Sequence, residues 1–269
     1  MEPMTNIDTP YQIEAEGLTD VGRKRQLNED AIRLNPEQRL YLLADGLGGH
    51  QAGEVASELA VETIRDFLAR FNPLEDTWPV EIDPSRSDRA NVLTTGIQMA
   101  NRAIFSRGRK ETSQAGMATT LVALQIVEQA AVIAHVGDSR LYRIRDDKMR
   151  QLTQDHNVIN ELRRQNRLSN DAAEQEDRSS RFRHVLTRAL GQAETVAIDL
   201  REEPLQDRDL FLLCSDGLSN MVSDDRALAL IRQADHLSVA CRALVDEANR
   251  NGGKDNISCI LVRCTLPPK

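Results

Sequence analysis

Aromatic residues are scarce in this sequence, because Phe, Trp and Tyr together make up 3% of its 269 residues. Proteins that bind single-stranded nucleic acid need aromatic rings on which bases stack, so this composition disfavours that class. The net charge of −8 also disfavours binding through phosphate contacts, which requires a basic face. We therefore expect no nucleic-acid partner and a core built mainly from Leu, Ile, Val and Ala.

Cysteines in C-x-x-C spacing and a secretory signal pattern are both absent. The four cysteines are Cys214, Cys241, Cys259 and Cys264. We expect reduced thiols and a cytoplasmic protein. The most apolar stretch, residues 118–137, is interrupted by Glu128 and Gln129 and is rich in β-branched residues. This pattern is typical of two buried strands joined by a turn, so no membrane span is expected.

Hydrophobic periodicity divides the chain into strands and helices. Apolar and polar residues alternate at 11–20, whereas apolar residues at 51–70 recur with the i, i+3, i+4, i+7 spacing of an amphipathic helix. Residues 72–88 hold three prolines and many acids and should form a loop. Further helices are expected near 93–104, 224–234 and 237–250, and further strands at 39–45, 117–127, 130–137, 140–146, 148–153, 195–200, 209–216 and 256–264.

The order of these segments predicts an α+β fold. Consecutive strands between 117 and 153 are joined by short polar turns, which indicates an antiparallel meander rather than alternating strands and helices. Residues 154–184 are strongly polar and should form an excursion over the surface of the sheet. No repeat or low-complexity linker divides the chain. We expect a tail at 1–10 and a single domain at 11–266.

Aspartates stand at the tips of four expected strands. They are Asp45, Asp138, Asp216 and Asp255, and the first three each neighbour a glycine. If these tips meet at one edge, the carboxylates repel one another strongly unless cations neutralise them. Oxygen ligands without a zinc-type Cys/His grouping favour Mg²⁺ or Mn²⁺, and two such ions can clamp a phosphoryl group. The alternative is that Asp45 and Asp216 are ordinary Asp-Gly turn residues, and residue pattern alone leaves both open.

Six short motifs in order resemble those of the metal-dependent serine/threonine protein phosphatases of type 2C, in their bacterial form. They are TDVGRKRQLNED at 19–30, ADGLGGHQAGEVAS at 44–57, GMATT at 116–120, HVGDSRLYRI at 135–144, LCSDGLSN at 213–220 and GGKDNISCILV at 252–262. The resemblance runs from about residue 12 to 265. It implies a four-layer αββα sandwich of two antiparallel sheets flanked by helices, with two Mn²⁺ or Mg²⁺ ions, and in some cases three, at one end.

The resemblance also implies roles for individual residues. Asp45 would bridge two metals, Gly46 would offer its carbonyl to the second, and Asp216 and Asp255 would complete the shell of the first. Asp138 would hold the weaker third ion, while Glu29 would reach the second metal through water and Asp30 would support the site from outside. Arg25 would grip the substrate phosphate as a fork, the alternative being a solvated residue in a basic run. Asp45, Asp216 and Arg25 are thus the expected catalytic residues.

The implied activity is hydrolysis of phosphoserine and phosphothreonine on proteins by a hydroxide that bridges two metal ions. The alternatives are a phosphatase of small phosphate esters and a non-catalytic interaction module on the same fold. His50 is a candidate general acid, or else a loop or helix-cap contact, and His135 is expected in the core. The excursion at 154–184 corresponds to the flap of the family. Expected partners are phosphorylated proteins, including targets of a cognate Ser/Thr kinase or the kinase itself, and the protein should be a monomer.

Overall fold

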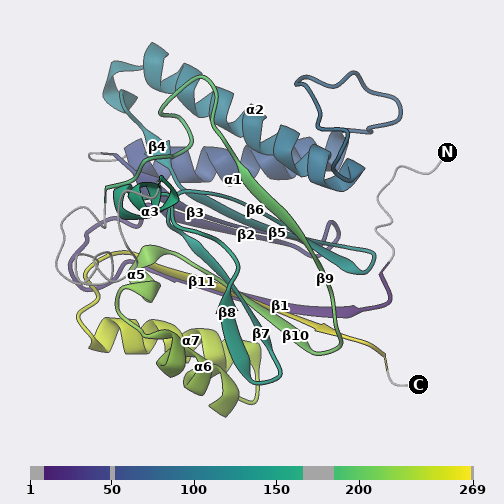
Figure 1. The fold of residues 1–269 in the computed structure, drawn as a ribbon. Helices are drawn as coiled ribbons and strands as arrows, with labels where there is room; N and C mark the ends of the chain where they lie inside the picture. The colour runs from purple at the N-terminus through teal and green to yellow at the C-terminus, as the bar shows by residue number, and fades with distance from the viewer. Residues whose placement is uncertain (1–8, 49–51, 166–184, 268–269) are drawn as a thin grey trace.

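The computed structural model describes residues 9–48, 52–165 and 185–267, and its strands form two antiparallel sheets that lie face to face (Figure 1). One sheet has the strand order β1-β11-β10-β7-β8, and the other has the order β2-β3-β5-β6-β9, with β4 paired to β3. The strands are β1 (Gln12–Asp20), β2 (Asp30–Asn35), β3 (Leu40–Leu47), β4 (Ala118–Thr119), β5 (Leu121–Val127), β6 (Ala130–Val136), β7 (Arg140–Arg145), β8 (Lys148–Gln151), β9 (Asp199–Pro204), β10 (Asp209–Cys214) and β11 (Ile257–Thr265).

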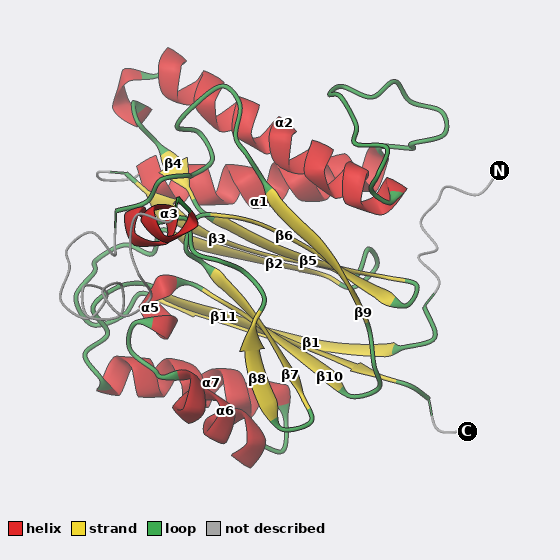
Figure 2. Ribbon diagram, in the orientation of Figure 1, coloured by secondary structure: helices red, strands yellow, loops and turns green. Residues whose placement is uncertain are grey.

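Helices cover the outer face of each sheet, with α1 and α2 over the sheet that contains β3 and with α6 and α7 over the sheet that contains β10 (Figure 2). The helices are α1 (Ala52–Arg70), α2 (Asp88–Lys110), the 3₁₀ turn η1 (Thr112–Gln114), α3 (Val158–Arg164), α5 (Asp216–Ser219), α6 (Asp224–Gln233) and α7 (Leu237–Arg250). The expected α+β sandwich of four layers is therefore confirmed.

Three apolar clusters fill the spaces between the four layers. One lies between α1, α2 and their sheet, one lies between the two sheets, and one lies beneath α6 and α7. The middle cluster holds the large rings of Tyr41 and Phe211, which are almost fully buried. Elsewhere Leu, Ile, Val and Ala dominate, as the low aromatic content predicts. Burial of this apolar surface is the main force that holds the layers together.

The two long helices begin and end where local chemistry dictates. Helix α1 buries the small residues Ala56 and Ala60 together with Ile64, which lets it pack closely on the sheet. Helix α2 begins after Ser87, whose side chain accepts a hydrogen bond from the Ala90 backbone N–H. The prolines between the two helices fall in the expected loop.

Three features of the chain differ from the sequence-based expectation. Strand β2 is absent from that expectation, because it has one buried residue and too few apolar positions to set a clear period. Residues 195–198 lie outside β9, since Val196 and Ile198 pack on the helical layer instead of pairing in the sheet. The expected single meander is divided, because the chain leaves one sheet after β6 and enters the other at β7.

None of the helices in the described ranges combines the length and apolarity needed to cross a bilayer. His50 and most of the expected flap, residues 166–184, lie outside the described residues. The described part of that excursion is residues 154–165, which comprise the end of the loop after β8 and helix α3.

Candidate metal centre

The strand directions bring the predicted aspartates to one edge of the sandwich. Strands β3 and β6 are both antiparallel to β5, so they run in the same direction and both end at this edge. Asp45 lies near the end of β3, and Asp138 follows β6. In the facing sheet the end of β10 lies beside the start of β11, which places Asp216 and Asp255 on adjacent strand tips.

The backbone N–H groups of Asp45 and Gly46 are held by hydrogen bonds to two other segments of the chain. The Asp45 N–H donates to Thr120 Oγ1 at 3.0 Å, and the Gly46 N–H donates to the Glu29 carbonyl at 3.0 Å. A Cβ atom at residue 46 would lie 2.2 Å from the Gly53 carbonyl oxygen, so no side chain fits there. Glycine is therefore required because β3 passes directly against the first turn of α1, and not only because an Asp-Gly pair turns easily.

Asp30 connects the two sheets beneath the cluster. It opposes Asp45 in the β2–β3 pairing, and its Oδ2 accepts a hydrogen bond of 2.6 Å from Ser258 Oγ at the start of β11. The Ser258 N–H in turn donates to Ser215 Oγ at 3.0 Å, next to Asp216. The two strand pairs that carry the acids are thus tied together by hydroxyl groups.

The loop at 21–29 carries Arg25 and Glu29 to the rim of the cluster. Arg25 Nη2 donates to Asp255 Oδ2 at 2.8 Å, and Arg25 Nη1 lies 3.7 Å from Glu29 Oε2. Asn256 holds this loop in place, because its Oδ1 accepts from the Glu29 N–H at 2.9 Å and its Nδ2 donates to the carbonyl of Leu27 at 2.9 Å. The guanidinium of Arg25 remains about half exposed, with 47% of its side-chain surface accessible.

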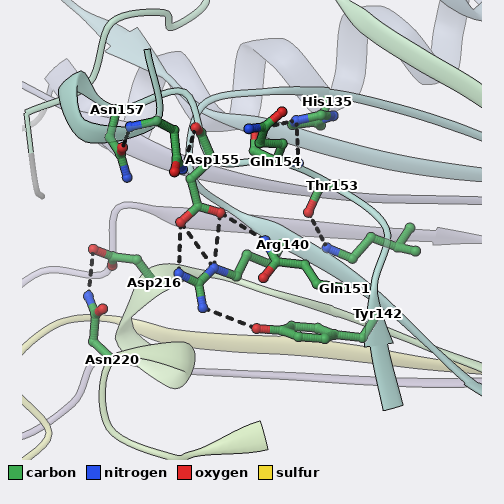
Figure 3. Close-up of polar contacts among 12 residues, drawn as sticks. His135, Arg140, Tyr142, Gln151, Thr153, Gln154, Asp155, Asn157, Asp216 and Asn220 are labelled. Atoms are coloured by element: carbon green, nitrogen blue, oxygen red, sulfur yellow. Dashed lines mark hydrogen bonds and ion pairs between the residues drawn. The ribbon is translucent and has the colours of Figure 1, made fainter. Parts of the chain in front are cut away.

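The two residues that follow Asp138 make side-chain contacts that fix this turn. Ser139 Oγ and Thr120 Oγ1 are 2.7 Å apart, so the residue after Asp138 shares a partner with the Asp45 backbone. Arg140 donates two hydrogen bonds to the Asp155 carboxylate, from Nε at 3.0 Å and from Nη2 at 2.7 Å (Figure 3). Figure 3 also shows Asn220 donating to Asp216, at 3.1 Å, below this pair.

Burial and mutual repulsion perturb the acids of the cluster. Burial is the largest cause that raises the pKa of Asp45 well above its usual range, and four neighbouring carboxylates raise it further. They are Asp30, Asp216, Asp138 and Asp255. Burial followed by the Asp216 carboxylate raises the pKa of Asp138 to about 7, and burial also raises that of Asp30 to about 7. The predicted convergence of four strand-tip aspartates is therefore present, with Asp30 as a fifth member.

A family profile described as protein phosphatase 2C matches residues 21–260. The chain belongs to this family. A serine/threonine phosphatase, stp, of Listeria innocua is 38% identical over 258 residues, which cover 95% of this chain and 97% of that protein. Protein phosphatase PhpP of Streptococcus pneumoniae is 36% identical over 248 residues, covering 91% of this chain and 95% of that protein.

Solved structures of the phosphatase 2C family share the fold over nearly the whole chain. The serine/threonine phosphatase PstP/Ppp of Mycobacterium tuberculosis has a TM-score of 0.79 at 31% identity, covering 93% of this chain and 98% of that one. The catalytic domain of serine/threonine phosphatase PstP in complex with two manganese ions has a TM-score of 0.77 at 29% identity, covering 94% of this chain and 98% of that one.

The acid centre of this phosphatase 2C chain suits hard divalent cations. Its donors are carboxylate and carbonyl oxygens, which are the ligands that Mg²⁺ and Mn²⁺ prefer. Glu29 Oε1 is buried without a hydrogen-bond partner of ordinary geometry among the described residues. Clustered carboxylates with raised pKa values ionise together only when positive charge balances them. The predicted ligand set therefore fits the group that the family implies.

A second cluster of metal-type side chains is unsuited to a cation. His135 stacks on His156 at 4.7 Å between ring centroids, and Asp199 lies beside them. The His156 Nδ1 already accepts the Gly137 N–H at 3.1 Å, so its only proton is on Nε2, the atom that faces Asp199. Asp199 also pairs with Arg188 at 2.7 Å. His135 is thus a buried core residue, as its strand predicts.

The sequence does not reveal the roles of several residues that support the site. Thr120, Asn256 and Ser258 stand within the quoted motifs, but their polar side chains carry no sign of distant partners. Asn256 and the Glu29 backbone, for example, are separated by 227 positions. A polar residue inside an otherwise buried strand start was the available signal, since such groups are hydrogen-bonded when buried.

Proposed function

We propose that this protein hydrolyses phosphoserine and phosphothreonine on other proteins, using Mn²⁺ or Mg²⁺. The observation that carries the proposal is the convergence of the four strand-tip aspartates at one edge, with the guanidinium of Arg25 at its rim. When bound, the divalent cations lower the pKa of water and polarise the phosphoryl group. Family membership supports two resident ions, as in the manganese complex of the phosphatase PstP.

The residues of this chain divide the work as follows. Asp45, Gly46, Asp216 and Asp255 would hold the two principal cations, Asp138 would hold a third, and Glu29 would contribute through water. Asp30 keeps the position of Asp45 by pairing with it across β2 and β3. Arg25 contacts Asp255 at the rim and is about half exposed, and its planar fork of N–H groups suits the oxygens of a phosphate.

The state of the cysteines bears on the cellular compartment. The four cysteines are buried free thiols, which is consistent with the reducing cytoplasm. We propose that the substrates include targets of a Ser/Thr kinase, or the kinase itself, and that residues 11–266 act as one monomeric catalytic domain. Light scattering on the full chain measures the oligomeric state directly.

Release of phosphate from a panel of phosphoSer, phosphoThr and phosphoTyr peptides tests the activity. We expect turnover of the first two in Mn²⁺ and none in EDTA. Asp216→Ala should lower kcat/KM by about 100-fold or more, equivalent to about 2.7 kcal/mol of transition-state stabilisation. The matched control is Asp235→Ala, which removes an exposed aspartate between α6 and α7.

Three outcomes would contradict the proposal in different ways. Activity that survives in EDTA would reject the metal mechanism. Hydrolysis of small aryl phosphates with no hydrolysis of phosphopeptides would favour the small-ester alternative. Mn²⁺ binding without turnover of any phosphate ester would favour the non-catalytic module.

A further inference from the structure

His156 is hydrogen-bonded to Gly137, the residue immediately before Asp138. It lies in the loop between β8 and α3, and its side chain is buried. The Gly137 N–H donates to His156 Nδ1 at 3.1 Å, and the His156 N–H donates to the Gly137 carbonyl at 2.9 Å. Two reciprocal bonds, one through a side chain and one through the backbone, therefore join this loop to the end of β6.

The imidazole has a defined tautomer. Burial is the largest cause that lowers the pKa of His156, to about 4, so the ring is neutral near pH 7 and one nitrogen carries a lone pair. The Gly137 N–H requires that lone pair on Nδ1. The proton on Nε2 then faces Asp199 Oδ2 at 3.3 Å. Arg188 Nη1 also lies 3.3 Å from Nε2, but it donates to the other oxygen of the same carboxylate at the shorter distance of 2.7 Å. This arrangement fixes the ring plane as well as its protonation.

Gly137 cannot be held by a side chain of its own. Its φ of 108° is one that other residues rarely adopt, and a Cβ atom there would lie 2.7 Å from the side chain of Thr120. Its orientation therefore depends on its hydrogen bonds. On the other side of Asp138, the Ser139 hydroxyl bonds to Thr120. Hydrogen bonds therefore hold both neighbours of Asp138: His156 bonds Gly137, and Thr120 bonds Ser139.

We propose that His156 is a positioning residue for Asp138, acting through the Gly137 peptide to aim the carboxylate into the acid cluster. The proposal rests on the proposed function in one respect, namely that Asp138 ligates a cation. Partners that orient a ligand from outside the metal site change metal affinity by about 10- to 100-fold when removed. A purely structural His156 would instead affect folding and leave the individual cation steps unchanged.

Two variants separate the contacts of the ring. In His156→Asn, the amide oxygen occupies approximately the place of Nδ1, so the bond from Gly137 is kept and the contact to Asp199 is lost. In His156→Gln, the amide nitrogen occupies approximately the place of Nε2, so the contact to Asp199 is kept and the acceptor for Gly137 is lost. Asp138→Asn identifies the cation step that depends on Asp138.

Isothermal titration of the full chain with Mn²⁺ alone gives the decisive measurement. We expect His156→Gln to weaken the step identified by Asp138→Asn about 10- to 100-fold. The remaining steps should stay within about twofold of the unmodified protein, and His156→Asn should resemble that protein at every step. Thermal unfolding in EDTA reports the fold of each variant separately.

Equal weakening in both His156 variants, or no weakening in His156→Gln, would overturn the positioning role while leaving the phosphatase assignment intact. No effect of Asp138→Asn on any step would show that Asp138 is not a ligand, and the role of His156 would fall with it. ¹⁵N NMR of the unmodified protein provides a test without a variant. A proton on Nδ1 of His156 would overturn the proposal, and a proton on Nε2 supports it.

Discussion

Arg25 is the cation that the loop at 21–29 presents to the acid cluster. Its guanidinium contacts Asp255 at 2.8 Å and is about half exposed, so it can reach an incoming anion without leaving the rim. Asn256 fixes the loop from the opposite side by its bonds to Leu27 and Glu29. The position of this arginine is therefore set by the same turn that carries Asp255.

Both the charge and the planar shape of the Arg25 guanidinium should contribute to phosphate recognition. We expect Arg25→Ala to lower kcat/KM for a phosphothreonine peptide about 100-fold, since one preorganised donor to a reacting oxygen is worth about that much. Arg25→Lys should recover only part, because an ammonium group lacks the planar fork. Steady-state kinetics measure both, and Lys24→Ala is the control for a neighbouring exposed charge. Similar losses in Lys24→Ala and Arg25→Ala would contradict a specific role.

The aspartates of the centre could be predicted from sequence because each stands at the tip of an apolar run. The sequence could not reveal how their backbones are held. Thr120 accepts the Asp45 N–H and bonds Ser139, yet its motif of small residues reads equally well as a strand start. His156 likewise lies in a polar loop, and nothing in that loop indicates its contact with Gly137, which is 19 positions away and beyond strands β7 and β8.

At the scale of elements, the long helices and the edge strands β1 and β8 were predictable, whereas the edge strand β2 was not. Helices α1 and α7 bury one continuous stripe, which gives a strong period over many residues. Strand β2 has one buried residue, Ala31, and its other positions are only half-buried. The change of sheet between β6 and β7 uses a turn as short as that of a hairpin, so the sequence offers no length signal for it.

Thr120 joins the elements that end at the centre, and its hydroxyl should matter more than its shape. We expect Thr120→Val to lower the free energy of unfolding by about 1–3 kcal/mol, because the Asp45 N–H loses its acceptor. Mn²⁺ affinity should fall in the same variant. Thr120→Ser, which keeps the hydroxyl, should retain Mn²⁺ affinity. Urea denaturation and Mn²⁺ titration measure these effects, and indistinguishable behaviour of the two variants would contradict the role of the hydroxyl.

At the scale of the whole molecule, the acid cluster should make the metal-free protein sensitive to pH. The pKa values of Asp30 and Asp138 are raised to about 7 in the folded state, so the folded chain holds protons that the unfolded chain has released. Stability should therefore fall as pH rises through 7. His156 acts oppositely, because its folded pKa is lowered to about 4, but its effect is complete above its unfolded value of about 6.5.

Thermal unfolding between about pH 6.5 and pH 8 separates these contributions. In EDTA we expect Tm to decrease across this interval, and Asp138→Asn should flatten the decrease. With Mn²⁺ present, the stabilisation relative to EDTA should grow with pH, because cations bind only ionised carboxylates. A Tm in EDTA that rises across the interval would show that the cluster does not govern the stability of the metal-free protein.

The acids of the centre come from both sheets, with Asp45 on one and Asp216 and Asp255 on the other. A cation held by residues of both sheets, as proposed, would act as a clasp at this end of the sandwich, in addition to the apolar layer between the sheets. Chelation should remove this clasp together with the activity. The free concentration of divalent cation should therefore set how long the folded protein survives proteolysis as well as how fast it works.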